Sequence, residues 1–241
     1  MAIAGKHGVT STTPQNIPFG AGTIHKNLAY TTPLYTKTSD VSITAGKTYY
    51  TRSGSSPNYT YTAVASPVLA DIGNYYEKTG GWNFNSSIIG ATSGGSKLSI
   101  VPEIANIDID GALVKIKEIS DVKTGGTATL EINFAELGTD ILKTAVLGAD
   151  GTSSDAEYDL VEDKPLIQSG DYFDNVAFVG KTLDGKKIIA VLDNALCTSG
   201  MELEGKNKEA GTIALTFECY ADIDSGLDVL PWHIYYPKTS S

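Results

Sequence analysis

A strict alternation of apolar and polar residues over positions 127–134 constrains the fold more than any other part of the sequence. The apolar residues fall on one side of an extended chain and the polar residues on the other. A period of two predicts a half-buried strand with one face in water. The apolar positions are Ala128, Leu130, Ile132 and Phe134. A second alternating run predicts another such strand, with Ile213, Leu215, Phe217 and Cys219 pointing inward.

Short extended runs separated by turn residues continue along most of the chain. We expect strands over Asn175–Thr182 and Lys187–Leu192, joined by the turn Leu183–Lys186. Leu230–Tyr236 reads as a last strand at a sheet edge, since Pro231 is tolerated there. The excess of strands predicts a mainly β (α+β) fold, with an antiparallel β-sandwich or partly closed barrel and long hairpin loops.

The stretch from Lys97 to Leu147 holds the best-defined elements. We expect short strands at 98–100, 107–109 and 114–117, before the strand at 127–134. The pairs Asp110-Gly111 and Gly125-Gly126 supply turn chemistry between these runs. One flanking α-helix is predicted near 139–147, capped by Thr139 and ended by Gly148.

Changes in composition divide the chain into three parts. Residues 1–29 are interrupted by glycine and proline, which predicts an extended N-terminal arm that docks on its own domain or on a neighbour. Residues 30–83 form a Tyr/Thr-rich β insertion. Residues 84–241 form the main β-sandwich domain.

The insertion holds 8 of the 13 tyrosines and contains a faint internal echo. Residues 49–54 and 75–80 share the order Tyr-Tyr-x-basic-hydroxyl-Gly. Tyrosine in quantity favours a surface that binds other surfaces, because its ring gives contact area at little entropy cost. A strand pair whose aromatic rings pack on each other explains the same residues.

The net charge of −10 is concentrated in the second half of the chain. Residues 1–120 hold 9 Lys and Arg against 7 Asp and Glu, or +2, and residues 121–241 hold 9 against 21, or −12. Such an acidic surface repels phosphates, which argues against DNA binding by that half. Solubility alone explains the charge equally well.

The start of the sequence lacks the apolar core of a signal peptide, and no apolar run has the length of a membrane span. Cys197 and Cys219 do not form a motif or a disulfide framework. We expect a soluble protein made in a reducing cytoplasm, with no membrane partner.

The sequence offers no set of residues for catalysis. Gly90–Lys97 resembles a phosphate loop only superficially, since a strand is expected after it instead of a helix. Asp108–Gly111 and Asp222–Gly226 lack the ligand count of a calcium loop. The histidines His7, His25 and His233 show no metal-ligand or triad spacing. We therefore expect no enzyme activity, no metal and no cofactor.

Three segments resemble the major tail (tail tube) proteins of long-tailed bacteriophages: Asn16–Ile24, Gly90–Ile119 and Asp228–Tyr236. The tract from Thr44 to Gly81 is similar to an insertion in some of them. The resemblance implies a structural virion protein, assembled in the bacterial host cytoplasm. Hexameric rings would stack into a tube through which DNA is ejected without specific binding. The implied partners are other copies of the chain and the tape measure, tail terminator and distal tail proteins.

Assembly requires contacts between subunits, and the exposed strands and the arm are the natural source of them. The expected interface residues are Ile17, Phe19 and Ile24 in the arm and Ile107, Ile109 and Leu113 in the hairpin. The rival hypothesis is a monomeric carbohydrate-binding β module, in which Trp82 and Trp232 stack on sugar rings.

Overall fold

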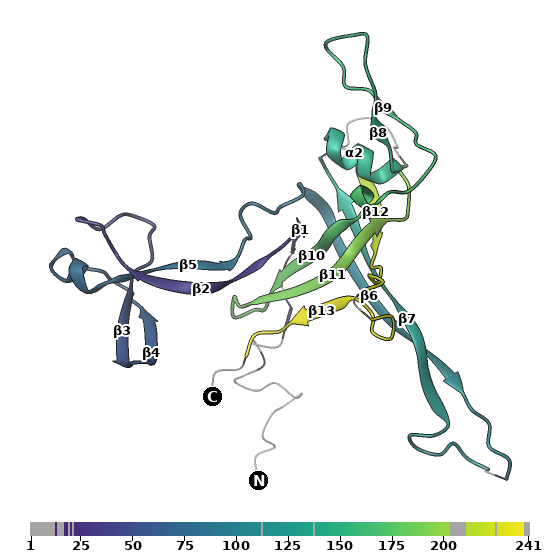
Figure 1. Cartoon of the computed structure of the whole chain (residues 1–241), viewed down its shortest axis with the longest axis horizontal. Coiled ribbons are helices and arrows are strands. Elements are labelled where there is room, and N and C mark those ends of the chain that lie inside the picture. Colours follow the sequence, from purple (N-terminus) through teal and green to yellow (C-terminus); the bar gives the residue numbers. More distant parts are fainter. Residues whose placement is uncertain are drawn as a thin grey trace. The chain divides into compact units, whose positions relative to one another are not determined.

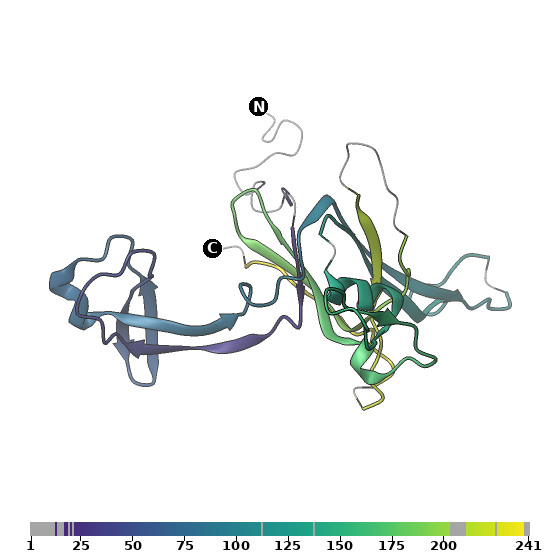
Figure 2. The same cartoon turned by 90° about the horizontal axis from the view of Figure 1, so that it is seen from above.

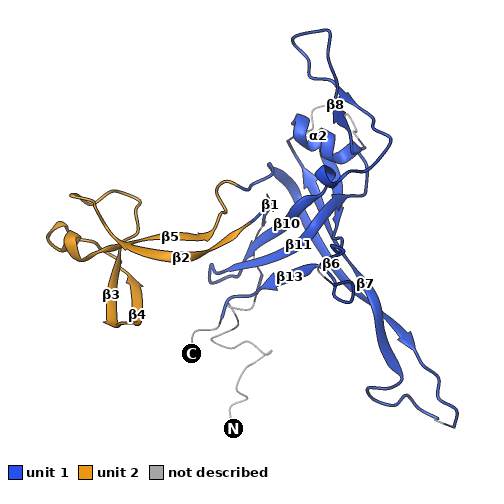
Figure 3. Ribbon diagram, viewed as in Figure 1, with its two compact units in different colours: residues 1–28, 87–241 blue, residues 29–86 orange. Residues whose placement is uncertain are grey.

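The computed structural model describes residues 13, 17–18, 20, 22–111, 113–136, 138–202, 211–224 and 226–238. The chain divides into two compact units (Figure 3). Unit 1 consists of residues 1–28 and 87–241, and unit 2 consists of residues 29–86. The predicted insertion at 30–83 lies inside unit 2.

Unit 1 is built on an antiparallel sheet of seven strands whose path runs β1-β10-β11-β12-β7-β6, with β13 paired to β11 (Figure 1). The predicted mainly β fold with antiparallel sheets is therefore confirmed. A separate two-stranded ribbon joins β8 to β9. The bounds are β1 Thr23–Lys26, β6 Thr92–Asn106, β7 Asp121–Phe134, β8 Ala149–Asp150, β9 Val161–Glu162, 3-10 helix η3 Ser169–Asp171, β10 Phe173–Lys181, β11 Lys187–Cys197, β12 Ile213–Glu218 and β13 Trp232–Tyr235.

The core of unit 1 follows the predicted alternation. Every apolar residue of the run in β7, from Ala128 to Phe134, is at most 1 % exposed. Strand β12 lies beside β7 with Leu215 opposite Ile132, so the two apolar faces point into one core. Cys219 lies past the end of β12 and is only partly buried. Each fully buried large side chain contributes about 1.5–3 kcal/mol to the stability of such a core.

The predicted hairpin between residues 175 and 192 is confirmed as the pair β10–β11, in which Val179 lies opposite Ile189. Its turn contains Gly185 at a φ of +85°, a backbone conformation that favours glycine. Strand β13 adds to β11 as the predicted last strand, with Pro231 just before its start.

The α-helix α2 spans Thr139–Val146 and buries Ile141 and Ala145. The predicted caps were wrong by one residue at each end. Gly138 occupies the N-cap position, and the Thr139 hydroxyl donates to Asp159 instead. The chain leaves the helix through Leu147 at a φ of +51°. A side chain on the next residue, Gly148, would come within 3.0 Å of the Glu162 carbonyl oxygen, which explains the glycine there.

The segment from residue 107 to residue 120 corrects the predicted strand pattern. The runs 107–109 and 114–117 were expected to be strands, but both lie in the loop that joins β6 to β7. Asp110-Gly111 does form a turn, with Gly111 at a φ of +86°. The apolar alternation in these runs was too short to distinguish a strand from a loop.

Gly125 and Gly126 were predicted to form a turn, but they lie in the middle of β7. A Cβ atom on Gly126 would be 2.8 Å from the Val101 carbonyl oxygen and 3.2 Å from the Pro102 Cα atom. The register of β6 against β7 shifts between Glu103 and Ile104, next to this close approach. The glycine is needed because the two backbones come too close for a side chain.

Unit 2 is a four-stranded antiparallel sheet in the order β2-β5-β3-β4. Its core includes two buried tyrosines, Tyr49 and Tyr75, whose rings lie 5.6 Å apart. The residues that follow them, Tyr50 and Tyr76, pair across β3 and β5. The sequence echo therefore marks two segments that meet in space, and aromatic packing explains Tyr49 and Tyr75. The bounds are β2 Tyr30–Lys37, β3 Tyr50–Ser55, β4 Asn58–Ala63, η2 Leu69–Asn74 and β5 Tyr76–Trp82.

An ion cluster around Lys47 fixes the loop that precedes β3. The Lys47 ammonium lies 2.8 Å from Asp40 and 3.0 Å from Glu77, and Tyr49 donates a hydrogen bond of 2.6 Å to Asp40. The hydrogen bond from Lys47 holds the pKa of Asp40 below its usual range. Hydrogen bonds from Thr38 and then from Lys47 lower the pKa of Glu77.

Replacing Lys47 with methionine should make the stability of unit 2 less dependent on pH in acid. The pKa values of both carboxyl groups are lowered in the folded chain. The stabilisation is therefore complete above the pKa values of the same groups in the unfolded chain, which are about 4. It is lost as the pH falls through the folded values. We expect the melting temperature of the wild type to fall more steeply than that of Lys47→Met below about pH 4, followed by tyrosine near-UV circular dichroism. Parallel curves would show that Lys47 does not stabilise the charged carboxylates.

Candidate self-association surface

The two halves of the β6–β7 hairpin have different surroundings. Near its root, Leu98 lies opposite Leu130 and packs against the core. Farther out, residues 101–104 of β6 and 121–124 of β7 are all exposed. Figures 1 and 2 both show the hairpin extending past the other strands of unit 1. This outer half, residues 101–111 and 113–124, is called the β6–β7 arm below.

Hydrogen bonds order the loop at the end of the arm. The backbone N–H of Ile107 donates to the Ser120 carbonyl at 2.7 Å, and that of Ile116 donates to the Ser120 hydroxyl at 2.9 Å. Lys115 bonds the Asp121 carboxylate at 2.8 Å. Ser120 is itself only 4 % exposed, so the loop closes around it. These hydrogen bonds tie both halves of the loop to Ser120 and Asp121.

The arm presents apolar side chains to solvent. Leu113 is fully exposed and Val114 is 77 % exposed at the end of the loop. The predicted interface residues Ile107 and Ile109 are 47 % and 36 % exposed, as a contact surface requires. A cluster of exposed apolar residues is typical of an interaction site. The arm also exposes Val101, Ile104, Ile116, Ile119 and Val122.

Strand β6 ends the sheet path and pairs only with β7 among the described strands. Its 15 residues therefore leave one long row of backbone groups without a neighbouring strand. Such an edge can accept a strand from another chain by ordinary backbone pairing. Lys97 lies on this strand and forms an ion pair of 3.0 Å with Glu131. A lysine on an edge strand disfavours unspecific pairing with other strand edges.

The predicted interface residues of the N-terminal arm differ in their exposure to solvent. Ile17 is 41 % exposed, and its carbonyl accepts a hydrogen bond of 2.8 Å from Leu183. Phe19 lies outside the described residues. Ile24 is fully buried in β1, which pairs with β10 of the same chain. The side chain of Ile24 therefore packs inside its own subunit and is not available to a neighbour.

The structure brings together one serine and one histidine that sequence analysis left apart. His25 Nδ1 lies 2.8 Å from the Ser87 hydroxyl, and Nε2 lies 2.8 Å from the Thr23 hydroxyl. His25 and Ser87 are 1 % and 3 % exposed, so a substrate has no access to them. Burial and then the nearby Lys187 charge lower the pKa of His25, which favours the neutral ring. We assign the pair a structural role at the root of β1.

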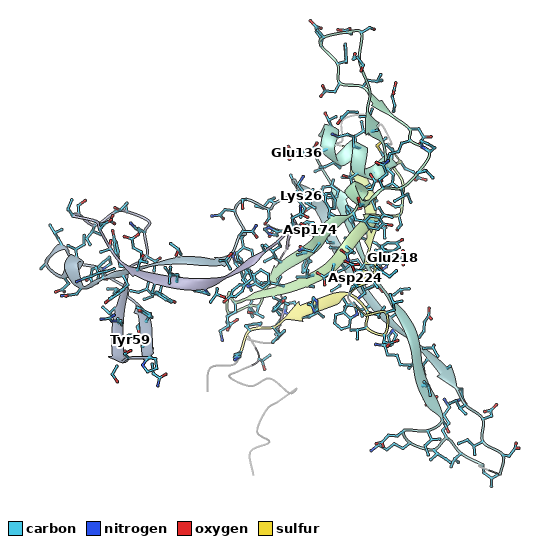
Figure 4. All side chains as sticks on the ribbon, in the orientation of Figure 1. Lys26, Tyr59, Glu136, Asp174, Glu218 and Asp224 are labelled. Atoms are coloured by element: carbon cyan, nitrogen blue, oxygen red, sulfur yellow. The ribbon has the colours of Figure 1, made fainter. Side chains whose placement is uncertain are left out.

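A cavity of about 640 Å³ lies beside α2. Its walls combine core side chains with the charged residues Lys26 and Glu136, which Figure 4 labels. Lys143, another lining residue, bonds Asp150 at 3.1 Å, and this hydrogen bond raises the pKa of the ammonium. A lysine held in its charged form does not act as a nucleophile. We therefore assign Lys143 a structural ion pair with Asp150.

Within the described residues, no group of three or more His, Cys, Asp and Glu side chains is arranged to hold a metal ion. Helices of sufficient length and apolar character to cross a membrane are likewise not found in the part of the chain that the structure describes. Comparison with known protein families and with curated protein sequences yields no match to this chain.

Proposed function

We propose that the chain is a structural protein whose copies assemble into rings, and that the rings stack into the tail tube of a bacteriophage. The single observation that carries this proposal is the β6–β7 arm, which combines an unpaired edge with an ordered apolar loop. The resemblance of Gly90–Ile119 to tail tube proteins falls on this same hairpin and supports it.

The proposed assembly uses two kinds of contact on unit 1. The free edge of β6 accepts a strand from the next subunit, and the exposed loop around Leu113 covers its apolar side chains on another copy. A contact between two different patches generates a ring if its rotation closes and a helical filament if it does not. The proposed ring is a hexamer, which follows from the resemblance.

The charge distribution fits a conduit for DNA. Unit 1 holds 14 of the 18 Lys and Arg residues and 25 of the 28 Asp and Glu residues, a net charge of −11. An acidic wall repels phosphates at short range, so DNA passes without being held. The proposed place of the assembled protein is the virion tail, where it would meet the tape measure, tail terminator and distal tail proteins.

Concentrated protein should form rings or tubes of constant diameter in negative-stain electron micrographs. Light scattering on a sizing column should show the 25.4 kDa chain leaving the monomer peak as concentration rises, because the arm buries its apolar residues between copies. Single particles of monomer mass at every concentration and ionic strength would overturn the proposal.

A monomeric carbohydrate-binding module is the alternative, and the same experiment separates the two. The tryptophans expected to stack on sugars lie in different units. Trp82 packs against Tyr30 at 5.2 Å and Phe84 at 6.4 Å, and the indole nitrogen of Trp232 is buried. Neither unit therefore presents a pair of tryptophans as a sugar platform.

A further inference from the structure

One face of the unit 2 sheet gathers most of its tyrosine rings. Residues directly opposite each other in an antiparallel pair share a face, and residues two apart on a strand share it too. The pairs Tyr50–Tyr76, Arg52–Tyr61 and Gly54–Tyr59 therefore place their side chains on one side. The pairs Lys37–Tyr76 and Tyr35–Lys78 extend this side across β2 and β5. We call it the aromatic–basic face.

The rings on this face hold one another in place. Tyr35 and Tyr61 stack in parallel with centroids 4.1 Å apart and an angle of 4°. The ring of Tyr50 meets Tyr35 edge-on at 5.2 Å, and that of Tyr76 meets Tyr61 edge-on at 5.3 Å. These four rings are half-buried, whereas Tyr59 near the β3–β4 turn is 40 % exposed (Figure 4). A preformed platform loses little entropy when a ligand binds.

Arg52 places a positive charge against two of the tyrosine rings on this face. Its guanidinium lies 4.4 Å from the centre of the Tyr59 ring and 4.9 Å from that of Tyr76. A guanidinium stacked on rings keeps its in-plane N–H donors free for a planar anion such as a carboxylate. Arg52 is exposed, so these donors face solvent.

The face carries positive charge without acidic residues among its strand positions. Lys37, Arg52 and Lys78 are exposed, and none forms an ion pair with a carboxylate in the described residues. Asp40 and Glu77 are occupied by Lys47. Unit 2 holds four Lys and Arg against three Asp and Glu, a net charge of +1, in a chain of net charge −10. Three cations without a carboxylate partner in the described residues, set among tyrosine rings, complement a ligand that has both flat apolar faces and negative charge.

We propose that the aromatic–basic face binds an acidic saccharide, a polymer of pyranose rings that carry carboxylate groups. The C–H face of a sugar ring packs on the tyrosine rings. Arg52 binds the carboxylate of one sugar through two N–H donors, and Lys37 and Lys78 attract the carboxylates of the adjacent sugars. Single-stranded nucleic acid also combines flat rings with negative charge. Three phosphate contacts give a single strand little affinity at physiological salt, so an oligothymidylate is used as the competing ligand in the test.

Calorimetric titration of the full chain with an oligogalacturonate tests the proposal, with a neutral oligogalactoside of equal length as the comparison. Binding should be seen with the acidic ligand only. Arg52→Gln should weaken it about tenfold, because a charge-assisted hydrogen-bonded pair is lost. Tyr59→Ala should weaken it by about fivefold through lost ring contact. The matched control Lys123→Gln removes one exposed lysine from unit 1 and should leave the affinity unchanged.

Lys78→Gln is a second test variant, needed in case Arg52→Gln disturbs the fold. The exposed Lys78 has no ring contact in the described residues, so its replacement leaves the ring packing intact. It should weaken binding with an unchanged melting temperature. Equal affinity for the neutral oligosaccharide, tighter binding of an oligothymidylate, an equal loss in Lys123→Gln, or no heat of binding at millimolar ligand would each overturn the proposal. The test does not involve assembly, so its outcome is independent of the proposed tube.

Discussion

Replacing Leu113 and Val114 together with aspartate should abolish rings and tubes while leaving the subunit folded. Both side chains are almost completely solvated in the single chain, at 101 % and 77 % exposure. Substitutions at such positions change the free energy of unfolding by no more than about 0.5 kcal/mol. In an assembled contact the same carboxylates would be buried without partners, which costs several kcal/mol for each site. Because every copy carries both changes, the loss is multiplied around a ring.

Electron microscopy and light scattering measure the loss of assembly, and thermal melting measures the fold. The matched control is Val41→Asp combined with Leu69→Asp, two exposed apolar residues of unit 2 at 88 % and 58 % exposure. This control adds the same two charges outside the β6–β7 arm and should still assemble. Tubes of normal length from the Leu113 and Val114 variant would remove the loop from the proposed mechanism.

Excising residues 29–86 and closing the gap with a short Gly/Ser linker should leave unit 1 folded and able to assemble. The chain leaves and re-enters unit 1 at adjacent points, since the Lys26 N–H bonds the Ser87 carbonyl at 2.7 Å. The Ile89 N–H bonds the Ile24 carbonyl at 3.1 Å in the same place. Asn175 holds Leu28, the last residue before the cut, through two hydrogen bonds. No member of the unit 1 core cluster comes from the excised segment.

The shortened chain should retain the far-UV circular dichroism of unit 1 and form tubes, but lose all binding of oligogalacturonate. A second linker of different composition controls for effects of the junction itself. Loss of the folded state would show that unit 2 supports the core of unit 1. Retained saccharide binding would place the proposed site outside the aromatic–basic face and overturn that inference without affecting the proposed tube.

Sequence reasoning worked where a single rule of local chemistry decides the structure. The alternation in β7 and β12 is a direct consequence of burying one face of a strand, and the turn at Gly185 needs a left-handed residue. It failed where the deciding contact comes from elsewhere in the chain. Gly126 reads as a turn residue in sequence, yet it is a glycine because the Val101 carbonyl lies against it.

The candidate interface was predictable in part for the same reason. The exposure of Ile107, Ile109 and Leu113 is the part that the structure shows, and their role in an interface stays a prediction. Ile24 has the same apolar character in sequence, and only its pairing with Phe178 in β10 shows that it belongs to the core. The aromatic–basic face was not predicted as a unit, since it depends on the register of four strands.

Pro102 interrupts the row of backbone donors along the open side of β6. A proline has no N–H group, so the row of donors along this 15-residue strand is interrupted at one point, beside the register shift at Glu103. A flat foreign strand can bond on either side of this gap but not continuously across it. We expect this gap to disfavour unspecific pairing of β6 with other extended chains and to favour a strand with a matching irregularity.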